Sequence, residues 1–372
     1  MGAHFVSGRI YGAPGYPASH PLSIQRVGTV EALCRILGWT GPAHPVAVSP
    51  VADLATLTRF HDPDYLAAIR RSEAAGLVTA QDRARYNIGT LENPVFAGLY
   101  ERASTSVGGS ILAAHLVAAG GIAWHPAGGT HHGMPDRANG FCFMNDPVFA
   151  ILALLDQGLS RVLYVDLDAH HGDGVEAAFR DETRVMTVSV HEAGRWPGTG
   201  RIEDRGAGRA RNLPVPRGMT DAEFGFLIDT AVLPLARDFA PEAVVVTMGA
   251  DALEGDPLSS LALSNGALWA GVEAVVACAP RAVVLGGGGY NPWTLARAWS
   301  GIWARLTGQE IPDRLPAEAE ALLRGLDCDL VEDEDRPDRW FTTLADPVRG
   351  GPVRPEFHAI ARAIRAPADA TA

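Results

Sequence analysis

One stretch limits, more than any other, what this chain can fold into: residues 161–174, which read R-V-L-Y-V-D-L-D-A-H-H-G-D-G. It opens with apolar and β-branched residues, a run that is typical of a buried strand in a parallel sheet. Polar side chains crowd the carboxyl end of this predicted strand, namely Asp166, Asp168, His170, His171 and Asp173. Side chains two residues apart on a strand point the same way, so Asp166, Asp168 and His170 would share one face if the extended geometry continued.

Two carboxylates and an imidazole on one side of a strand, followed by glycines that let the backbone turn, suit a divalent metal ion. In open α/β sheets, ligand sites lie outside the carboxyl ends of the strands, which is where this cluster falls. The alternative is an acidic strand end that caps the next helix. The density of the cluster favours the metal site.

Strand and helix patterns alternate along the middle of the chain. Besides the strand that opens residues 161–174, apolar strand patterns cover 121–124, 184–191, 243–248 and 281–285. Helical patterns cover 21–37, 103–119, 146–159, 221–239, 265–279 and 292–306. Strands that alternate with helices predict an α/β fold, an open parallel sheet with helices on both faces.

The organisation of the chain favours one domain, although its length of 372 residues would allow two or three. The sequence contains no internal repeat, and no linker divides the candidate metal ligands. We therefore predict a single domain over residues 1–372, with a core at about 20–308. A Pro- and acid-rich C-terminal segment at about 309–372 would wrap around this core and contain one last helix at 355–365.

Composition narrows the class of protein further. No stretch reaches the 18 or more apolar residues of a membrane span, and the first residues lack the pattern of a signal peptide. The four cysteines are scattered without C-x-x-C spacing, which favours a reducing cytoplasm. The formal net charge of −12 argues against nucleic acid as a partner and is compatible with cationic peptides.

Three further polar motifs follow predicted strands. After the strand at 121–124 comes G-G-T-H-H-G, at residues 128–133. A lone histidine is usually structural, but adjacent histidines between glycines in a loop are not typical of a core. Asp251 follows the strand at 243–248, and four glycines and Tyr290 follow the last strand. Glycines there would let the backbone approach a bound group closely.

Together these motifs resemble those of a known family. H-P-A-G-G-T-H-H-G-M-P-D-R-A-N-G-F-C-F-M-N-D, D-L-D-A-H-H-G-D-G-V, P-G-T-G, G-A-D-A-L-E-G-D-P-L and G-G-G-G-Y occur in this order. They are similar to the zinc-dependent histone deacetylase family, and within it most similar to the bacterial acetoin-utilization deacetylases. The resemblance covers about residues 20–308 and implies the arginase-deacetylase fold, which agrees with the parallel sheet predicted above.

The resemblance also implies two sites for cations. The zinc ligands would be Asp168, His170 and Asp251, with a water in the open position, as in catalytic zinc sites. Iron(II) is an alternative, because a carboxylate-rich ligand set is not strongly selective. A structural K⁺ or Na⁺ would lie at the family's inner monovalent-cation site, formed here by Asp166, Asp168, His170, Ser189 and Val190.

The same resemblance implies roles for the remaining motif residues. His132 would be the general base, His131 an electrostatic or acid partner, and Tyr290 the donor to the oxyanion. Asp173 and Asp166 would hold the second ring nitrogens of the two histidines. The implied substrate-binding residues are Phe141 and Trp196 as tunnel walls, Gly140 and Leu258 beside the tunnel, and Glu92 at its rim.

The sequence departs from the family pattern at three places. Thr130 stands where many relatives have a bulky residue, which would leave the cavity beneath the metal more open or polar. The segment 191–196 is shorter than in close relatives, so Trp196 matches the family's tunnel wall less closely than Phe141 does. Glu92 replaces an aspartate that grips the substrate backbone, and a longer carboxylate would do the same with looser placement.

The implied activity is hydrolysis of N6-acetyl-lysine in a protein or peptide, releasing acetate and free lysine. An alternative is a deacetylase of small acetylated amines such as acetylpolyamines. An arginase-like enzyme with two manganese ions is less consistent, because Leu253 stands where a bridging carboxylate would be needed. A catalytically inactive acyl-lysine reader is disfavoured because every expected catalytic residue is present. We expect no nucleic-acid or membrane partner, and oligomeric state has no signal in the sequence.

Overall fold

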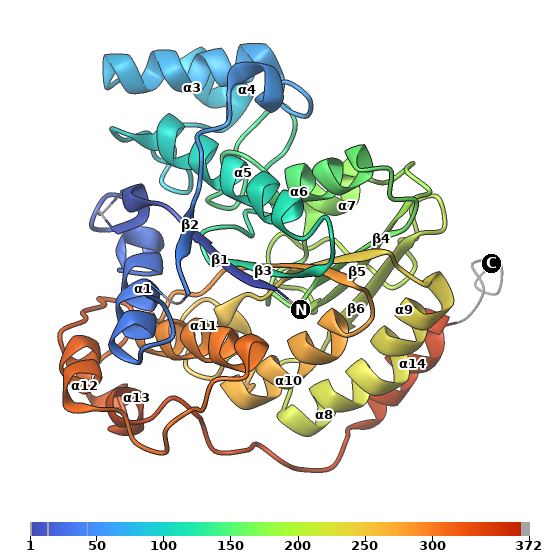
Figure 1. The fold of residues 1–372 in the computed structure, drawn as a ribbon. Coiled ribbons are helices and arrows are strands. Elements are labelled where there is room, and N and C mark those ends of the chain that lie inside the picture. Colours follow the sequence, from blue (N-terminus) through green and yellow to red (C-terminus); the bar gives the residue numbers. More distant parts are fainter. Residues whose placement is uncertain (1, 13–14, 43, 366–372) are drawn as a thin grey trace.

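In residues 2–12, 15–42 and 44–365, which the computed structural model describes, eight strands form one parallel sheet (Figure 1). The strands are β1 (Ala3–Ser7), β2 (Val46–Val48), β3 (Gly121–His125), β4 (Val162–Asp166), β5 (Val185–Glu192), β6 (Ala210–Val215), β7 (Ala243–Thr247) and β8 (Arg281–Leu285). Their order across the sheet is β2-β1-β3-β8-β7-β4-β5-β6. The predicted open parallel sheet is confirmed.

Helices cover both faces of this sheet (Figure 1). One side carries α3 (Pro63–Ala75), α4 (Ala80–Tyr86), α5 (Leu99–Leu116), α6 (Asp146–Asp156) and α7 (Asp173–Ala178). The other side carries α1 (Val27–Ile36), α8 (Asp221–Leu227), α9 (Leu233–Phe239), α10 (Asn265–Val276) and α11 (Pro292–Thr307). The remaining helices are the short α2 (Leu54–Leu57) and, after α11, α12 (Ala317–Arg324), α13 (Arg339–Thr342) and α14 (Pro355–Arg365).

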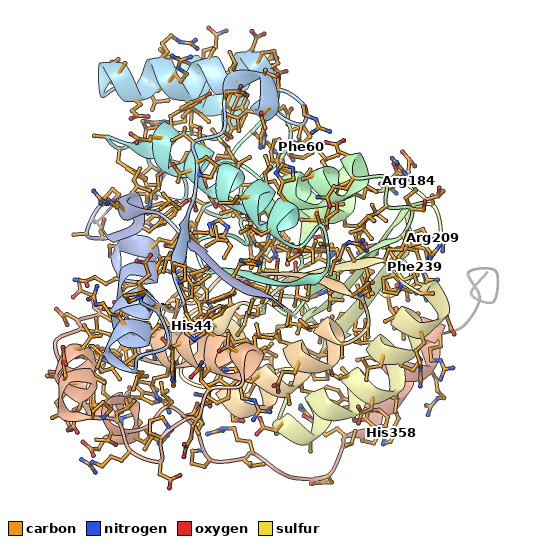
Figure 2. All side chains as sticks on the ribbon, viewed as in Figure 1. His44, Phe60, Arg184, Arg209, Phe239 and His358 are labelled. Carbon is orange, nitrogen blue, oxygen red and sulfur yellow. The ribbon has the colours of Figure 1, made fainter. Side chains whose placement is uncertain are left out.

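Alternating side chains of the strands feed two separate cores. In β4, Val162 and Tyr164 pack in the core beneath α5 and α6, whereas Leu163 and Val165 pack in the larger core beneath α1, α8, α10 and α11. Both sets are buried, so the strand reads in sequence as a continuous apolar run. Side chains fill the space between the sheet and both helix layers (Figure 2).

Three strands have no counterpart among the sequence predictions, namely β1, β2 and β6. β2 has only three residues, and β6 contains Arg211, Asn212 and Pro214. These two strands form the edges of the sheet, where short strands and proline are tolerated because one side needs no ladder partner. Such strands lack the apolar signal by which the central strands are recognised.

Helix boundaries differ from the predictions by several residues. The helix predicted at 21–37 begins only at Val27, because Pro21–Ser23 forms a separate 3-10 turn. The helix predicted at 221–239 consists of α8 and α9 joined by a π-helical turn at Ile228–Val232. The predicted C-terminal helix at 355–365 is confirmed as α14.

The segment after α11 runs along the outside of the other elements. α12 contacts α1, α13 contacts α11, and α14 lies against β6 and α8 (Figure 1). The division into a core and a wrapping C-terminal segment stays a prediction, and its last seven residues lie outside the described residues. No helix in the described part of the chain combines the length and apolar character needed to cross a membrane.

Strand order brings the predicted motifs together. β3, β8, β7 and β4 are consecutive neighbours, and all are parallel, so their carboxyl ends lie at the same edge. The loops that follow these four strands carry the histidine pair, the glycine run with Tyr290, Asp251, and Asp168 with His170. The candidate site therefore lies at this edge of the sheet, as expected for an open α/β fold.

Candidate active site

Three side chains form a candidate metal-binding triad at the carboxyl edge of the sheet. One ligand atom from each of Asp168, His170 and Asp251 lies within 4.8 Å of the others. Nδ1 of His170 is 2.9 Å from Oδ2 of Asp251 and 3.2 Å from Oδ1 of Asp168. The extended geometry considered for residues 166–170 is wrong, because β4 ends at Asp166 and a bend turns Asp168 and His170 toward Asp251.

The chemistry of these ligands fits a cation. Asp168 and Asp251 are fully buried, and burial together with the charge of Asp168 raises the pKa of Asp251. A divalent cation would relieve this repulsion. Three ligands at about 2.0–2.2 Å from one ion stand roughly 3 Å apart, which matches the two separations measured from Nδ1 of His170. Glycine is required beside the triad, since a Cβ at Gly288 would overlap the Asp251 carboxylate.

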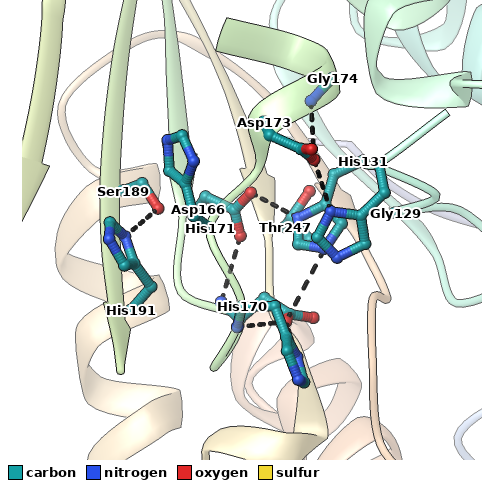
Figure 3. A network of polar contacts seen from close by, with 12 residues as sticks. Gly129, His131, Asp166, His170, His171, Asp173, Gly174, Ser189, His191 and Thr247 are labelled. Atoms are coloured by element: carbon teal, nitrogen blue, oxygen red, sulfur yellow. Dashed lines mark hydrogen bonds and ion pairs between the residues drawn. The ribbon is translucent and has the colours of Figure 1, made fainter. Parts of the chain in front are cut away.

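Two histidines lie next to the triad, each hydrogen-bonded to an aspartate. Nδ1 of His131 is 2.6 Å from Oδ2 of Asp166, and Nδ1 of His132 is 2.7 Å from Oδ1 of Asp173 (Figure 3). The ring centroids of the two histidines are 3.9 Å apart. Nε2 of His132 makes no hydrogen bond to any described residue, so this nitrogen is available to a ligand.

The two histidines have opposite pKa shifts. Burial alone would lower the pKa of His131, but the charges of Asp166 and Asp168 outweigh it and raise the pKa to about 9. Burial and the neighbouring charge of His131 lower the pKa of His132 to about 4. At neutral pH this arrangement favours a protonated His131 beside a neutral His132 that can accept a proton.

Tyr290 follows β8 and is held through its backbone. Its N–H donates to Oδ2 of Asp256 at 2.7 Å, and its hydroxyl makes no hydrogen bond to the described residues. Burial, followed by the charge of Asp251, raises the pKa of Tyr290 well above its ordinary value. The hydroxyl therefore stays protonated at neutral pH and can donate to a bound oxygen.

The site lies between an open outer pocket of ≈ 780 Å³ and an inner cavity of ≈ 170 Å³. Four residues line both spaces, namely His132, Gly140, Phe141 and Tyr290. The outer pocket is also lined by Trp196, whose ring centroid is 4.7 Å from that of His132. Gly140 has φ +52°, and a Cβ there would overlap the Trp196 ring, so only glycine fits between the walls.

Glu92 and Leu258 line the outer pocket as well. The carboxylate of Glu92 accepts hydrogen bonds from the N–H of Gly140 at 3.2 Å and from the side-chain amides of Asn87 and Asn93 at 3.1 Å each. Glu92 is therefore a fixed part of the pocket wall. The N–H of Leu258 donates to Oδ1 of Asp256 at 2.9 Å, so Asp256 supports Leu258 and Tyr290 together.

The inner cavity is lined by Thr130 and Arg26. The Thr130 hydroxyl donates to Oδ1 of Asp146 at 2.5 Å, so this small side chain is turned toward a buried carboxylate. Nη2 of Arg26 donates to the carbonyl of Gly287, but its buried Nε has no partner among the described residues. The sequence predicted no role for Arg26, because a single arginine on a predicted helix does not show where in the fold its side chain lies.

The residues of the expected monovalent-cation site also lie together. Asp166 and Ser189 are register partners on β4 and β5, and Val190 follows Ser189. The Ser189 hydroxyl is 2.8 Å from Nδ1 of His191 (Figure 3). Every residue predicted for the site is thus found around the triad, in the pocket or beside the strand ends.

Three charged groups at the mouth of the outer pocket were missed in the sequence. Arg195 and Arg217 line this pocket with Glu192. The Glu192–Arg195 pair has the spacing i, i+3 and begins at the last residue of β5, which is a usable local signal. Arg217 lies beyond the next strand and has no such signal, because only the pairing of β5 with β6 brings it near.

Comparisons with known proteins agree with this geometry. The parallel sheet with a candidate metal-binding triad buried at its carboxyl edge defines an enzyme of the arginase-deacetylase fold. A family model for the histone deacetylase domain matches residues 20–306, and the chain belongs to the histone deacetylase family. This family is metal-dependent and hydrolyses acetyl amides.

Relatives match most of the chain. It is 35% identical over 329 residues to the Acetoin utilization protein AcuC of Bacillus subtilis (strain 168), covering 84% of each chain. It is 38% identical over 314 residues to Histone deacetylase 19 of Arabidopsis thaliana, covering 81% of this chain and 61% of that longer relative. The crystal structure of an HDAC homolog from Aquifex aeolicus matches with a TM-score of 0.94 and 36% identity, covering 98% of this chain and 100% of that one. The predicted family is confirmed.

Proposed function

We propose that this protein is a zinc-dependent deacetylase of N6-acetyl-lysine in proteins or peptides, releasing acetate and free lysine. The observation that carries the proposal is the pair of unpartnered groups beside the Asp–His–Asp triad. Nε2 of His132 and the hydroxyl of Tyr290 make no hydrogen bond within the described residues, and both line the space where the pocket and the inner cavity meet.

Asp168, His170 and Asp251 would hold the zinc ion, which supplies Lewis acidity toward the amide carbonyl and the attacking water. Iron(II) would serve the same ligands. His132, held by Asp173, would take the proton of the water and deliver it to the leaving amine. Proton transfer of this kind commonly contributes about 10²–10⁴-fold.

His131 and Tyr290 would stabilise charge in the same reaction. The positive charge favoured on His131 by Asp166 and Asp168 lowers the energy of negative charge that develops nearby. The Tyr290 hydroxyl would donate to the oxyanion formed from the amide carbonyl. Because Asp256 holds the Tyr290 backbone, this donor is positioned before the substrate arrives.

The inner cavity suits the acyl half of the substrate. Thr130 lines this cavity, and the unpartnered Nε of Arg26 offers a donor to a carboxylate. We assign acetate, the product released on this side, to that donor. A K⁺ or Na⁺ at Asp166, Asp168, His170, Ser189 and Val190 would stabilise the strand ends that carry the triad.

A peptide is the substrate that the outer pocket supports best. Phe141 and Trp196 leave a slim apolar passage suited to a lysine stem, and Glu92 offers a carboxylate to backbone amides at the mouth. Small acetylated amines, the alternative, would use the same passage without the amides. The mouth favours the peptide because Glu192 is bound by Arg195 and leaves little charge for the ammonium groups of a polyamine. By contrast, Oε1 of Glu92 accepts only one hydrogen bond from the described residues and can accept another from a backbone amide.

The test is a substrate panel assayed with the metal-loaded protein. Acetyl-lysine peptides and acetylpolyamines should be compared by kcat/KM at equal ionic strength. We expect kcat/KM to be at least tenfold higher for the peptides. Efficient turnover of acetylpolyamines with little turnover of peptides would replace this proposal with the small-amine alternative.

A further inference from the structure

The mouth of the outer pocket carries charged side chains that the proposed chemistry does not use. We call them the mouth arginine cluster, which consists of Glu192, Arg195, Arg217 and Ser260. They come from three separate segments: the end of β5, the turn after β6 and the loop after Asp256. Glu192, Arg195 and Arg217 line the pocket that also contains His132, His170 and Tyr290.

Glu192 and Arg195 neutralise each other. Nε of Arg195 lies 2.6 Å from Oε2 of Glu192, and Nη2 lies 2.8 Å from Oε1, which makes the pair bidentate. The N–H of Ser260 also donates to Oε2 at 2.8 Å, and Glu192 is only 4% exposed. A buried pair with this geometry is strong and leaves little net charge for a ligand.

Arg217 adds a positive charge that this pair does not cancel. Its Nε is 3.8 Å from Oε1 of Glu192, beyond hydrogen-bond distance, and its side chain is 77% exposed. Nη2 donates to the Ser260 hydroxyl at 2.8 Å, and the N–H of Gly218 donates to the Ser260 carbonyl at 2.7 Å. These contacts hold the guanidinium at the mouth, while its Nη1 donates to none of the described residues.

The other charged group at the mouth has the opposite sign but is already bound. Glu92 accepts three hydrogen bonds, from Asn87, Asn93 and Gly140. The mouth therefore presents one guanidinium that is held in place and has unused hydrogen-bond donors. Both carboxylates at the mouth already accept hydrogen bonds from the protein. The charge of this guanidinium complements a carboxylate near the acetylated amine, and a positive charge at the same place would be repelled.

We propose that the mouth selects acetyl-lysines that have an acidic residue close by in the peptide, with Arg217 as the specificity-determining residue. This inference rests on the proposed peptide deacetylase function. A peptide advances about 3.3–3.6 Å per residue, so an acidic side chain within about two positions of the acetyl-lysine falls in reach of Arg217. Because Arg217 is exposed, the preference is moderate, about three- to tenfold in kcat/KM, and weakens as salt screens the charges.

The experiment uses matched peptides with one central acetyl-lysine and Glu, Gln or Lys at a single position, up to two residues on either side. Wild type, Arg217→Gln and Arg217→Glu are compared at about 0.05 M and 0.5 M salt. For wild type we expect the Glu peptide to exceed the Gln peptide three- to tenfold at one or more positions, chiefly through KM. The ratio should approach one in Arg217→Gln and at high salt, and Arg217→Glu should prefer the Lys peptide.

Arg362→Gln on α14 is the matched control, since this exposed arginine lies outside the pocket and its loss changes net charge equally. It should keep the wild-type ratio. Thermal unfolding of each variant verifies folding. An equal Glu/Gln ratio in wild type and Arg217→Gln overturns the inference alone. Absence of turnover on every peptide, with turnover of a small acetylated amine, overturns the proposed function together with the inference.

Discussion

The floor and the mouth of the site are built in different ways. We call Asp168, His170, Asp251, His131 and His132 the floor, and Glu92, Trp196, Leu258 and Arg217 the mouth. Floor residues follow central strands and are buried, with His170 the most exposed at 8%. In the mouth, Trp196 is 42% exposed and the Arg217 side chain is 77% exposed.

The difference separates chemistry from selection. Each floor side chain contacts a partner that fixes its position or its charge, such as Asp166 for His131 and Asp173 for His132. Mouth residues come from loops far apart in the chain, and contacts of their side chains, such as those of Glu92 and Arg217, hold them in place while leaving some donors and acceptors to a ligand. We therefore expect changes in the floor to abolish turnover of every substrate and changes in the mouth to alter the choice among substrates.

The largest effect should follow from removal of a triad carboxylate. Asp251→Ala should abolish metal binding and activity, because it removes one of the three proposed ligands. The fold should survive, because the change also removes the repulsion between two buried carboxylates, Asp168 and Asp251. Metal analysis, activity and circular dichroism measure the three outcomes. Asp156→Ala, which removes an exposed ion pair with Arg59, is the control and should keep the metal. Two tightly bound manganese ions in the wild type would contradict the assignment of one metal to this triad.

His132→Ala should reduce kcat by about 10²–10⁴-fold without loss of metal. The reason is that His132 lies beside the triad with a free Nε2 and is not one of its three members. Metal content and kcat measured on the same sample separate the two roles. If the variant loses its metal, His132 belongs to the ligand set, and its assignment to proton transfer alone is wrong.

Tyr290→Phe should reduce kcat by about 10²–10³-fold, which is the usual loss for one oxyanion donor. Its backbone contact with Asp256 is unaffected by this change, so Leu258 and the mouth should keep their positions. The ratio of kcat/KM between any two peptides should therefore match that of the wild type. Near-normal turnover would overturn the role of the hydroxyl.

Glu92→Gln should lower kcat/KM for acetyl-lysine peptides about tenfold, because charge-assisted hydrogen bonds to backbone amides contribute roughly 1.5–3 kcal/mol. The glutamine retains a carbonyl that can accept the hydrogen bond from Gly140. The substitution therefore tests the charge of Glu92 without removing its support of the pocket wall. Turnover of a small acetylated amine should barely change. Equal losses on both substrates would mean that Glu92 only supports Gly140.

The smallest effect on turnover should come from His61, which supports the loop between β3 and α6. Its Nδ1 is 3.1 Å from the Met134 carbonyl, and its Nε2 accepts from the N–H of Asn145 at 3.1 Å, so the neutral form is required. Burial lowers its pKa from 6.5 to about 4. Between pH 6.5 and pH 4 the unfolded chain binds the proton more readily than the folded protein does. The free energy of unfolding therefore falls as the pH falls through this range, by up to about 3 kcal/mol.

His61→Ala should therefore unfold more easily at pH 7 but lose less stability on acidification. Urea unfolding between pH 7.5 and pH 4.5 measures the slope of the unfolding free energy against pH. His358→Ala, at an exposed position of α14, should keep the wild-type slope (Figure 2). An unchanged slope in His61→Ala would assign the acid sensitivity to other buried histidines.

Much of the fold could be predicted because the central strands carry strong local signals. β4, β5, β7 and β8 are buried on both faces and read as apolar runs, and the polar residues after them predicted where the site lies. β2 and β6 could not be predicted, since edge strands tolerate proline and polar residues. The end of β4 at Asp166 could not be predicted either, because the alternation of polar and apolar residues continues beyond that position.

The sequence by itself determined the floor. Its residues lie within short motifs next to strands. The strand pattern predicted the edge of the sheet where they lie, and the resemblance of the motifs to a known family implied their chemistry. Only the tertiary structure decided the mouth, where Glu92 supports Gly140 and Arg217 meets Ser260. The physical reason is the local signal and not the distance along the chain. Floor residues follow apolar strands whose parallel carboxyl ends meet at one edge, so His170 and Asp251 are brought together although they are 81 residues apart. Glu92 and Arg217 lie in loops without such a signal, and their contacts form only after the sheet has placed those loops.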